Sequence, residues 1–226
     1  MLNNKKIKIV TALAVTPIHV GVGQEFGAVD LPVQRDTLNY PVIYASSFKG
    51  ALKQECARVQ GEIQEIERQK HKINRVRDES LCAKLFGSDV DPEKGISSFS
   101  VSDLRLLFIP ARSAINGAIY LTTIYMIDSV LEYLNMAKGQ SSFIDHLIEE
   151  LNQLKEDTAQ GQQTKVDVMG IQNVPLRNPG NFLASLFCES ALYSLLGKKV
   201  AVATDEIVGG DASVLIDRAL LRVSRN

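Results

Sequence analysis

The order of apolar patterns along the chain is the feature that most constrains its fold. From Ile7 to Val15 the larger side chains recur at every second position, and most of the residues between them are also apolar. This pattern is typical of a strand covered on both faces. Later segments have helical periods or short apolar runs, separated by turn residues such as Pro110 and the pair Asn116-Gly117. The predicted elements are a strand at 7–15, a helix from about 47 to 72, strands at 104–109 and 118–125, helices at 127–135, 143–156 and 181–196, and strands at 199–203 and 214–223.

This order predicts an α+β fold. A strand, a helix, two strands, a helix and a strand form a ferredoxin-like unit, in which an antiparallel sheet carries helices on one face. The polar segment from Glu156 to Gly170 is long and rich in turn residues, so we expect it to be flexible in isolation.

Length and composition predict one globular domain over residues 1–226, with insertions around 55–97 and 136–180. The chain has 226 residues, of which 45% are apolar, and can bury a core. No apolar run approaches the ~18 residues of a membrane span, and the polar start at residues 2–6 lacks the apolar core of a secretion signal. We therefore expect a cytoplasmic protein.

The three cysteines are Cys56, Cys82 and Cys188. Because they are odd in number, far apart and form no CxxC pair, the sequence suggests neither a disulfide framework nor a zinc site. We expect them to be small buried side chains.

The charge balance limits how the chain can bind nucleic acid. A formal net charge of −1 argues against binding through overall positive charge, so any contact has to come from a local patch. One basic cluster lies at the end of the long predicted helix. We interpret it as a solvent-exposed face of the helix, and the alternative is that it contacts RNA. The cluster comprises Arg68, Lys70, His71, Lys72, Arg75 and Arg77.

A glycine-punctuated loop follows the first predicted strand. Gly21, Gly23 and Gly27 permit backbone angles that other residues disfavour, and they allow the main chain to approach a polyanion closely. Asp30 follows in a stiff, locally apolar segment, which makes it a candidate metal ligand or general base. The alternative for Asp30 is to satisfy backbone donors of its own loop. His19, at the start of the loop, is either a structural histidine or a functional one.

The next predicted helix begins with features that favour anions. Ser46 or Ser47 is a suitable N-cap, and exposed N–H groups at a helix start attract phosphate oxygens. Lys49 and Lys53 lie four residues apart and therefore on one face of that helix. A loop that carries an acid next to a cationic helix start can hold a phosphate backbone.

In this order and spacing, these features resemble the RAMP superfamily of CRISPR RNA-binding proteins. The resemblance is greatest to the repeated backbone subunit of type III effector complexes in its Cmr (type III-B) form. It covers roughly the first 125 residues and is specific because seven blocks appear in the family's order. The matching blocks are 19–23, 27–35, 41–43, 46–50, 85–87, 98–103 and 107–113.

The resemblance implies a single RAMP domain, an RRM-like palm with inserted helical and loop elements. It implies that copies of the chain stack head-to-tail along a CRISPR guide RNA, beside other type III subunits, while guide pairing reads the target RNA. A loop aspartate of the family helps to cleave the target with a divalent metal ion, here expected to be Mg or Mn, and Asp30 matches that residue. His19 is the second catalytic candidate.

The expected RNA contacts follow from the same resemblance. Arg112 resembles the guide-contacting arginine of the family, although an ion pair with a carboxylate such as Asp103 is an equal alternative. The full expected set is Gly21, Gly23, Ser46, Ser47, Lys49, Lys53 and Arg112.

The C-terminal region departs from the family pattern. Where the family commonly has a glycine-rich loop before its last strand, this chain keeps only Gly209-Gly210. Two alternatives therefore stand beside a cleaving backbone subunit. One is a structural RNA-binding filament subunit without cleavage, and the other is a stand-alone endonuclease that processes guide RNA.

Overall fold

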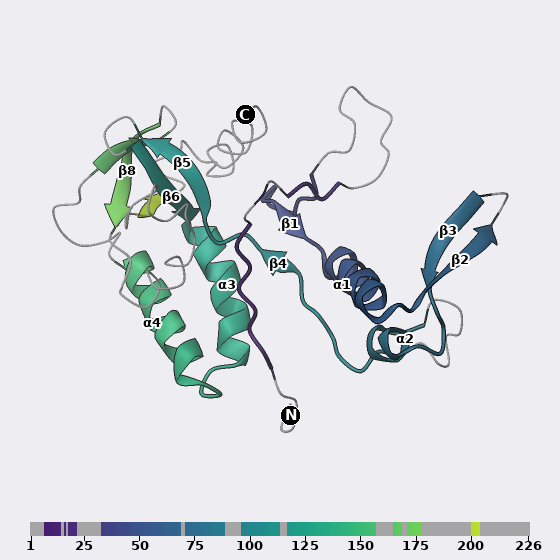
Figure 1. The fold of residues 1–226 in the computed structure, drawn as a ribbon. Helices are drawn as coiled ribbons and strands as arrows, with labels where there is room; N and C mark the ends of the chain where they lie inside the picture. The colour runs from purple at the N-terminus through teal and green to yellow at the C-terminus, as the bar shows by residue number, and fades with distance from the viewer. Residues whose placement is uncertain are drawn as a thin grey trace. The chain divides into compact units, whose positions relative to one another are not determined.

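Figure 1 shows the fold of the chain in a computed structural model. Its described residues are 7–14, 16, 18–21, 33–68, 71–88, 96–113, 117–156, 165–168, 171–177 and 200–203. Two compact units divide the chain. We call them the barrel unit, which comprises Met1–His19, Asp36–Tyr40 and Arg105–Asn226, and the hairpin unit, which comprises Val20–Arg35 and Pro41–Leu104.

Strands of the barrel unit close into a barrel in the order β5-β6-β9-β8-β7. The pair β6–β9 is parallel, and the other pairs are antiparallel. The strands are β5 (Ile109–Ser113), β6 (Gly117–Thr123), β7 (Lys165–Val168), β8 (Ile171–Arg177) and β9 (Val200–Ala203).

Alternate residues of these strands pack in two different apolar clusters. In β6, Ile119 and Leu121 pack in one apolar cluster with residues of all the other barrel strands, while Tyr120 packs in a second cluster with two helices. In β9, Val200 and Val202 join the helical cluster, and Ala201 and Ala203 join the strand cluster. Because side chains alternate across a strand, both faces of β6 and β9 are buried.

The two helices are α3 (Ile124–Met136) and α4 (Ser142–Glu156), which pack on each other (Figure 1). In α3, the Thr123 hydroxyl caps the start by accepting a hydrogen bond from the Met126 N–H. In α4, the buried side chains recur every three or four residues, so they form one apolar stripe. They are Ile144, Leu147, Ile148, Leu151 and Leu154. Both helices are confirmed at their predicted places.

The N-terminal segment is not the predicted strand. Residues 7–14 form no strand, and burial alternates only from Ile7 to Val10, because residues 11–14 are all exposed. Ile7 and Ile9 pack partly buried against the α3–α4 cluster, while Lys8 and Val10 are exposed. The alternation therefore reflects packing of one side of an extended segment, and the prediction that both faces are covered is wrong.

Within its described residues, the hairpin unit contains two helices and the strands of two small sheets, apart from Arg105, which the barrel unit includes. β1 (Val42–Ile43) pairs with β4 (Leu104–Arg105), and β2 (Ile63–Arg68) pairs with β3 (His71–Val76) as an antiparallel hairpin. The helices are α1 (Ala45–Gln60) and α2 (Leu81–Phe86).

Helix α1 ends twelve residues before its predicted end at Lys72. Gly61 follows the helix in the left-handed conformation, with φ of 66°, and its N–H bonds to carbonyls of the last turn. The chain then continues into the β2–β3 hairpin instead of a longer helix. The basic cluster therefore lies on a hairpin and on the segment that follows it, so its predicted helical setting is wrong.

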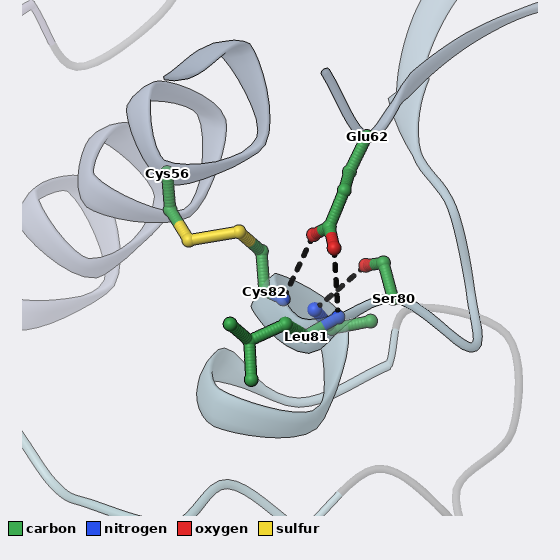
Figure 2. The surroundings of a disulfide bond; sticks show 6 residues. Cys56, Glu62, Ser80, Leu81 and Cys82 are labelled. Carbon is green, nitrogen blue, oxygen red and sulfur yellow. Dashed lines mark hydrogen bonds between the residues drawn. A yellow bond between two sulfur atoms is a disulfide. The ribbon is translucent and has the colours of Figure 1, made fainter. Parts of the chain in front are cut away.

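The prediction that the cysteines form no disulfide is wrong for two of them. Cys56 of α1 and Cys82 of α2 form a disulfide, with their Cα atoms 5.9 Å apart (Figure 2). Their 26-residue separation gave no signal, because the packing of α1 on α2 brings them together. Cys82 is buried as expected, whereas Cys188 lies outside the described residues.

A carboxylate beside the disulfide fixes the start of α2. Glu62 accepts hydrogen bonds from the N–H groups of Leu81 and Cys82, each 3.0 Å long (Figure 2). The bond from Cys82, aided by those from Leu81 and Ser80 and by Arg77, lowers the pKa of Glu62 despite some desolvation. Ser80 caps the same helix end by accepting from the Ala83 N–H.

The remaining elements give a mixed result. The strands predicted at 118–125 and 199–203 are confirmed as β6 and β9, but the run 104–109 is divided between β4 and β5, and β5 includes the predicted turn residue Pro110. β7 lies inside the segment expected to be flexible in isolation, and that flexibility stays a prediction. The predicted elements at 181–196 and 214–223 lie outside the described residues.

The mixed helix and strand class is confirmed, while the ferredoxin-like arrangement stays a prediction. In the part of the chain that the structure describes, no helix combines the length and apolar character needed to span a bilayer.

Candidate nucleic-acid interface

The principal predicted residue, Asp30, lies outside the described residues, as does Gly23. Of the other predicted site residues, the hairpin unit contains Gly21, Ser46, Ser47, Lys49 and Lys53, and the barrel unit contains His19 and Arg112.

Gln34 joins the two ends of the loop segment that contains Asp30. Gly21 and Val33 form an antiparallel bridge, and the Gln34 N–H donates to the Val20 carbonyl over 2.9 Å. The Gln34 side chain also contributes, because its Nε2 donates to the Gly21 carbonyl over 3.1 Å. The described residues on the two sides of that segment, Gly21 and Gln34, are therefore held together.

The same side chain contacts the start of α1. Its Nε2 donates to the Ser47 hydroxyl over 3.1 Å, and its Oε1 accepts from the Tyr44 N–H over 3.2 Å. With only 7% of its surface exposed, Gln34 is a buried polar residue whose amide hydrogen-bonds to three residues. The base of the loop and the first turn of α1 are thus one polar network.

Helix α1 begins earlier than predicted. Tyr44 is the N-cap residue, with no side-chain cap of its own, and the helix starts at Ala45. The Asp103 carboxylate accepts from the Ala45 N–H over 2.7 Å and so replaces a local cap. The prediction that Ser46 or Ser47 caps the helix is wrong, because a distant carboxylate and the Gln34 amide already satisfy donors at this end.

Lys49 is held by neighbours within the hairpin unit. Its Nζ donates to the Ser97 hydroxyl over 2.7 Å and lies 5.9 Å from the centre of the Phe99 ring. Phe99 in turn packs edge-on against Phe86. Because Lys49 is only partly exposed, its ammonium is a positioned charge beside the first turn of α1.

The other predicted contacts differ in exposure. Lys53 is 8% exposed, so its stem packs inside the hairpin unit instead of standing clear on the helix face. Ser46 is exposed and Ser47 partly so, while in the barrel unit His19 and Arg112 are both exposed. These positions do not test RNA binding, and each role stays a prediction.

Where its side chains are described, the basic cluster on the β2–β3 hairpin has nearby acidic partners. Lys72 pairs with Glu65 over 2.8 Å across the two strands, and Arg75 pairs with Asp78 over 3.3 Å. Both pairs are partly or largely exposed, and pairs of this kind contribute little to stability.

Sequence reasoning missed a second polar centre, which lies in the barrel unit. Asp36 accepts from the Leu38 and Tyr40 N–H groups through Oδ1, and from the Tyr125 hydroxyl over 2.7 Å through Oδ2. Arg105 reaches the same Oδ2 over 3.3 Å. An aspartate before a tight turn is a known signal for such self-capping, so this role could have been expected from the sequence.

This centre shifts the titration of one residue. Burial, aided by the hydrogen bond to Asp36, raises the pKa of Tyr125 to about 12. The Tyr40 ring lies 4.6 Å from the Tyr125 ring and is itself buried. The phenol therefore remains a neutral donor that holds the turn after the Asp30 segment against α3.

Across the described residues, no three His, Cys, Asp or Glu side chains come together as a metal site. Those residues do not supply the donor set expected for Mg or Mn, and Asp30 lies outside them.

The comparisons place the chain in a known class. The RAMP superfamily profile matches residues 11–186. This covers well over half of the chain, and the chain belongs to the RAMP superfamily.

Within that class, two similar proteins are Cmr4 subunits. The chain is 31% identical to the CRISPR system CMR subunit Cmr4 of Saccharolobus solfataricus, over 94% of this chain and 71% of that protein. It is 29% identical to the Cmr endoribonuclease Cmr4 of Pyrococcus furiosus, over 58% of this chain and 40% of that protein. The resemblance to the Cmr-type backbone subunit is thereby confirmed.

Solved structures agree on the fold. A type III-B Cmr-beta complex in its apo state has a chain that matches with a TM-score of 0.61 at 23% identity, over 91% of this chain and 67% of that one. The Cmr-beta complex bound to cognate target RNA also has a matching chain, with a TM-score of 0.61 at 24% identity, over 88% of this chain and 65% of that one.

Proposed function

We propose that the chain is a guide RNA-binding backbone subunit of a type III CRISPR effector complex that cleaves complementary target RNA at regular intervals. The observation that carries this proposal is the 31% identity to a Cmr4 subunit over 94% of the chain. The name of the P. furiosus relative as an endoribonuclease supports the cleavage, and the target-bound Cmr-beta relative supports action on RNA within an assembly. Such a complex acts in the cytoplasm, with further copies of the chain and other type III subunits as partners.

The barrel unit suits the role of a palm in this proposal. Its helices α3 and α4 pack together in the apolar cluster that includes outward residues of β6 and β9, as the helical layer of a ferredoxin-like palm does. The exposed Arg112 of β5 would contact guide RNA from this unit, and His19 would orient the glycine loop.

The hairpin unit supplies the proposed phosphate contacts. Lys49 is held beside the first turn of α1 by Ser97 and Phe99, so its charge is positioned before RNA arrives. The network around Gln34 holds Gly21 and Ser47 close to the same turn. Lys53 contributes more through packing, because it is nearly buried.

Asp30 is the residue to which we assign cleavage. With a target nucleotide splayed out, its 2′-oxygen can attack the adjacent phosphorus in line while the bond to the 5′-oxygen breaks. The Asp30 carboxylate accepts the 2′-hydroxyl proton, and solvent protonates the leaving oxygen. The requirement for Mg or Mn is a separate proposal from the family resemblance, and no step above depends on the ion.

The test is target cleavage by a reconstituted complex that carries Asp30→Asn. We expect guide binding to persist and target cutting to be lost, whereas the exposed control Glu149→Gln on α4 cuts like the parent. Addition of EDTA, followed by Mg or Mn, tests the ion in the same assay. Normal cutting by Asp30→Asn would refute the assignment and favour another catalytic group. Processing of guide precursor by the isolated chain would favour the stand-alone endonuclease.

A further inference from the structure

Gln34 is a buried polar residue that hydrogen-bonds to residues from separate segments of the chain. Its amide contacts Gly21 before the loop, Tyr44 at the cap of α1, and Ser47 in the first turn. Its backbone adds two bonds, from its own N–H to the Val20 carbonyl and from the Val42 N–H to its carbonyl, of 2.9 and 3.1 Å. All these residues belong to the hairpin unit.

A glutamine amide suits this arrangement because it carries both a donor and an acceptor. The Gly21 carbonyl needs a donor and the Tyr44 N–H needs an acceptor, and one glutamine side chain supplies both. A glutamate in the same place accepts from Tyr44 but cannot donate to Gly21 while it is ionised. A methionine has a similar volume but removes both hydrogen bonds, at a side chain that is 7% exposed.

We infer that the Gln34 amide is a positioning residue for target cleavage: it fixes both ends of the segment containing Asp30 against the first turn of α1. This inference rests on the proposed function. In-line attack requires the reacting groups to be placed closely, and a displacement of about 1 Å can cost roughly 100-fold in rate. Gln34 therefore acts through the loop base on the cleavage step and does not touch the RNA itself.

The inference is tested in the reconstituted complex under single-turnover conditions. We expect Gln34→Met to cut about 10- to 100-fold more slowly than the parent, with its affinity for guide and target RNA unchanged. The matched control is Gln54→Met, which places the same substitution on an exposed position of α1 and keeps the parental rate. Thermal unfolding of each variant shows that the proteins compared are folded.

Gln34→Glu provides the readout that a general loss of structure would not give. Its carboxylate, once protonated, regains a donor for the Gly21 carbonyl. The cleavage rate of this variant, divided by that of the parent, is therefore expected to rise as the pH falls from about 8 to about 5, toward the ordinary glutamate range. This recovery also covers the case in which Gln34→Met does not fold.

The outcomes separate the two proposals. If Asp30→Asn cuts normally, the proposed function fails whatever Gln34 does. If Asp30→Asn is inactive while folded Gln34 variants cut at the parental rate, the inference about Gln34 is overturned. It is also overturned if cutting and RNA affinity fall together and Gln34→Glu shows no recovery at low pH.

Discussion

The α3–α4 pair and helix α1 are held in place by different kinds of contact. Helix α4 buries a stripe of five apolar side chains, whereas α1 buries only Lys53 and Ala57. The placement of α1 depends instead on its ends and on the disulfide: Asp103 caps its start, and Gly61 terminates it. The helical spacing of apolar residues is therefore enough to specify the α3–α4 pair. The placement of α1 is specified by contacts between residues that are distant in sequence.

The strongest test of this contrast is a cavity in the α3–α4 core. Leu151 is fully buried in α4, so Leu151→Ala is expected to lower the free energy of unfolding by about 2–5 kcal/mol. Gln153→Ala, at an exposed position of the same helix, is the control and has little effect. Urea denaturation measures both, and equal stability of the two variants would contradict the assignment of this core.

In the hairpin unit, the disulfide provides the corresponding test. Loss of the Cys56–Cys82 bond, which closes a 26-residue separation, is expected to cost roughly 3 kcal/mol. Thermal unfolding with and without a reductant measures the loss for the parent. Cys82→Ser is insensitive to the reductant, while the control Cys188→Ser responds as the parent does. A parent whose unfolding ignores the reductant would argue that these thiols are not bonded in solution.

The smallest expected effect concerns a polar contact within the barrel unit. Tyr125→Phe removes the hydrogen bond to Asp36, which we expect to cost about 1–2 kcal/mol at neutral pH. Since burial raises the pKa of Tyr125 to about 12, its neutral form stabilises the fold below the ordinary tyrosine pKa of about 10. This contribution is lost as the pH rises through about 12.

Denaturation at several alkaline pH values measures that effect. The parent is expected to converge on the stability of Tyr125→Phe between about pH 10 and about pH 12. Tyr133→Phe, also on α3, keeps the parental profile and serves as the control. A constant gap between the parent and Tyr125→Phe across this range would show that the phenol does not titrate as described.

The sequence predicted the regions in which burial follows a period. Residues such as Leu147 and Leu151 repeat at helical spacing, and α4 forms where they do. The same reasoning extended α1 too far, because it gave no weight to Gly61, a helix-ending signal that directly follows the last helical residue, Gln60. In the segment Ile7–Ile9 burial alternates although no strand forms. An alternating sequence does not reveal whether a partner strand is present.

The candidate site could be predicted only in part. Motif order predicted the start of α1 and also pointed to Asp30, whose role stays a prediction. It could not show that Asp103 would cap that helix or that Lys53 would be nearly buried. Gln34 gave no signal, because its role depends on segments that meet only in the folded chain. The pairing of Cys56 with Cys82 was hidden for the same reason.

The β2–β3 hairpin has a consequence for how this part of the molecule opens. Its register runs from the pair Ile63↔Val76 to the pair Arg68↔His71, and its sheet has two strands within the described chain. At the base, the Glu62 carboxylate holds the start of α2 and the Glu62 backbone carbonyl accepts from the Arg77 N–H. Val76 is buried there. An isolated hairpin is marginally stable, so its amide protons should exchange with solvent along a gradient, fastest at the tip and slowest at the base. The two strands are thus expected to separate first at the tip of the hairpin, while the pairs at its base stay formed.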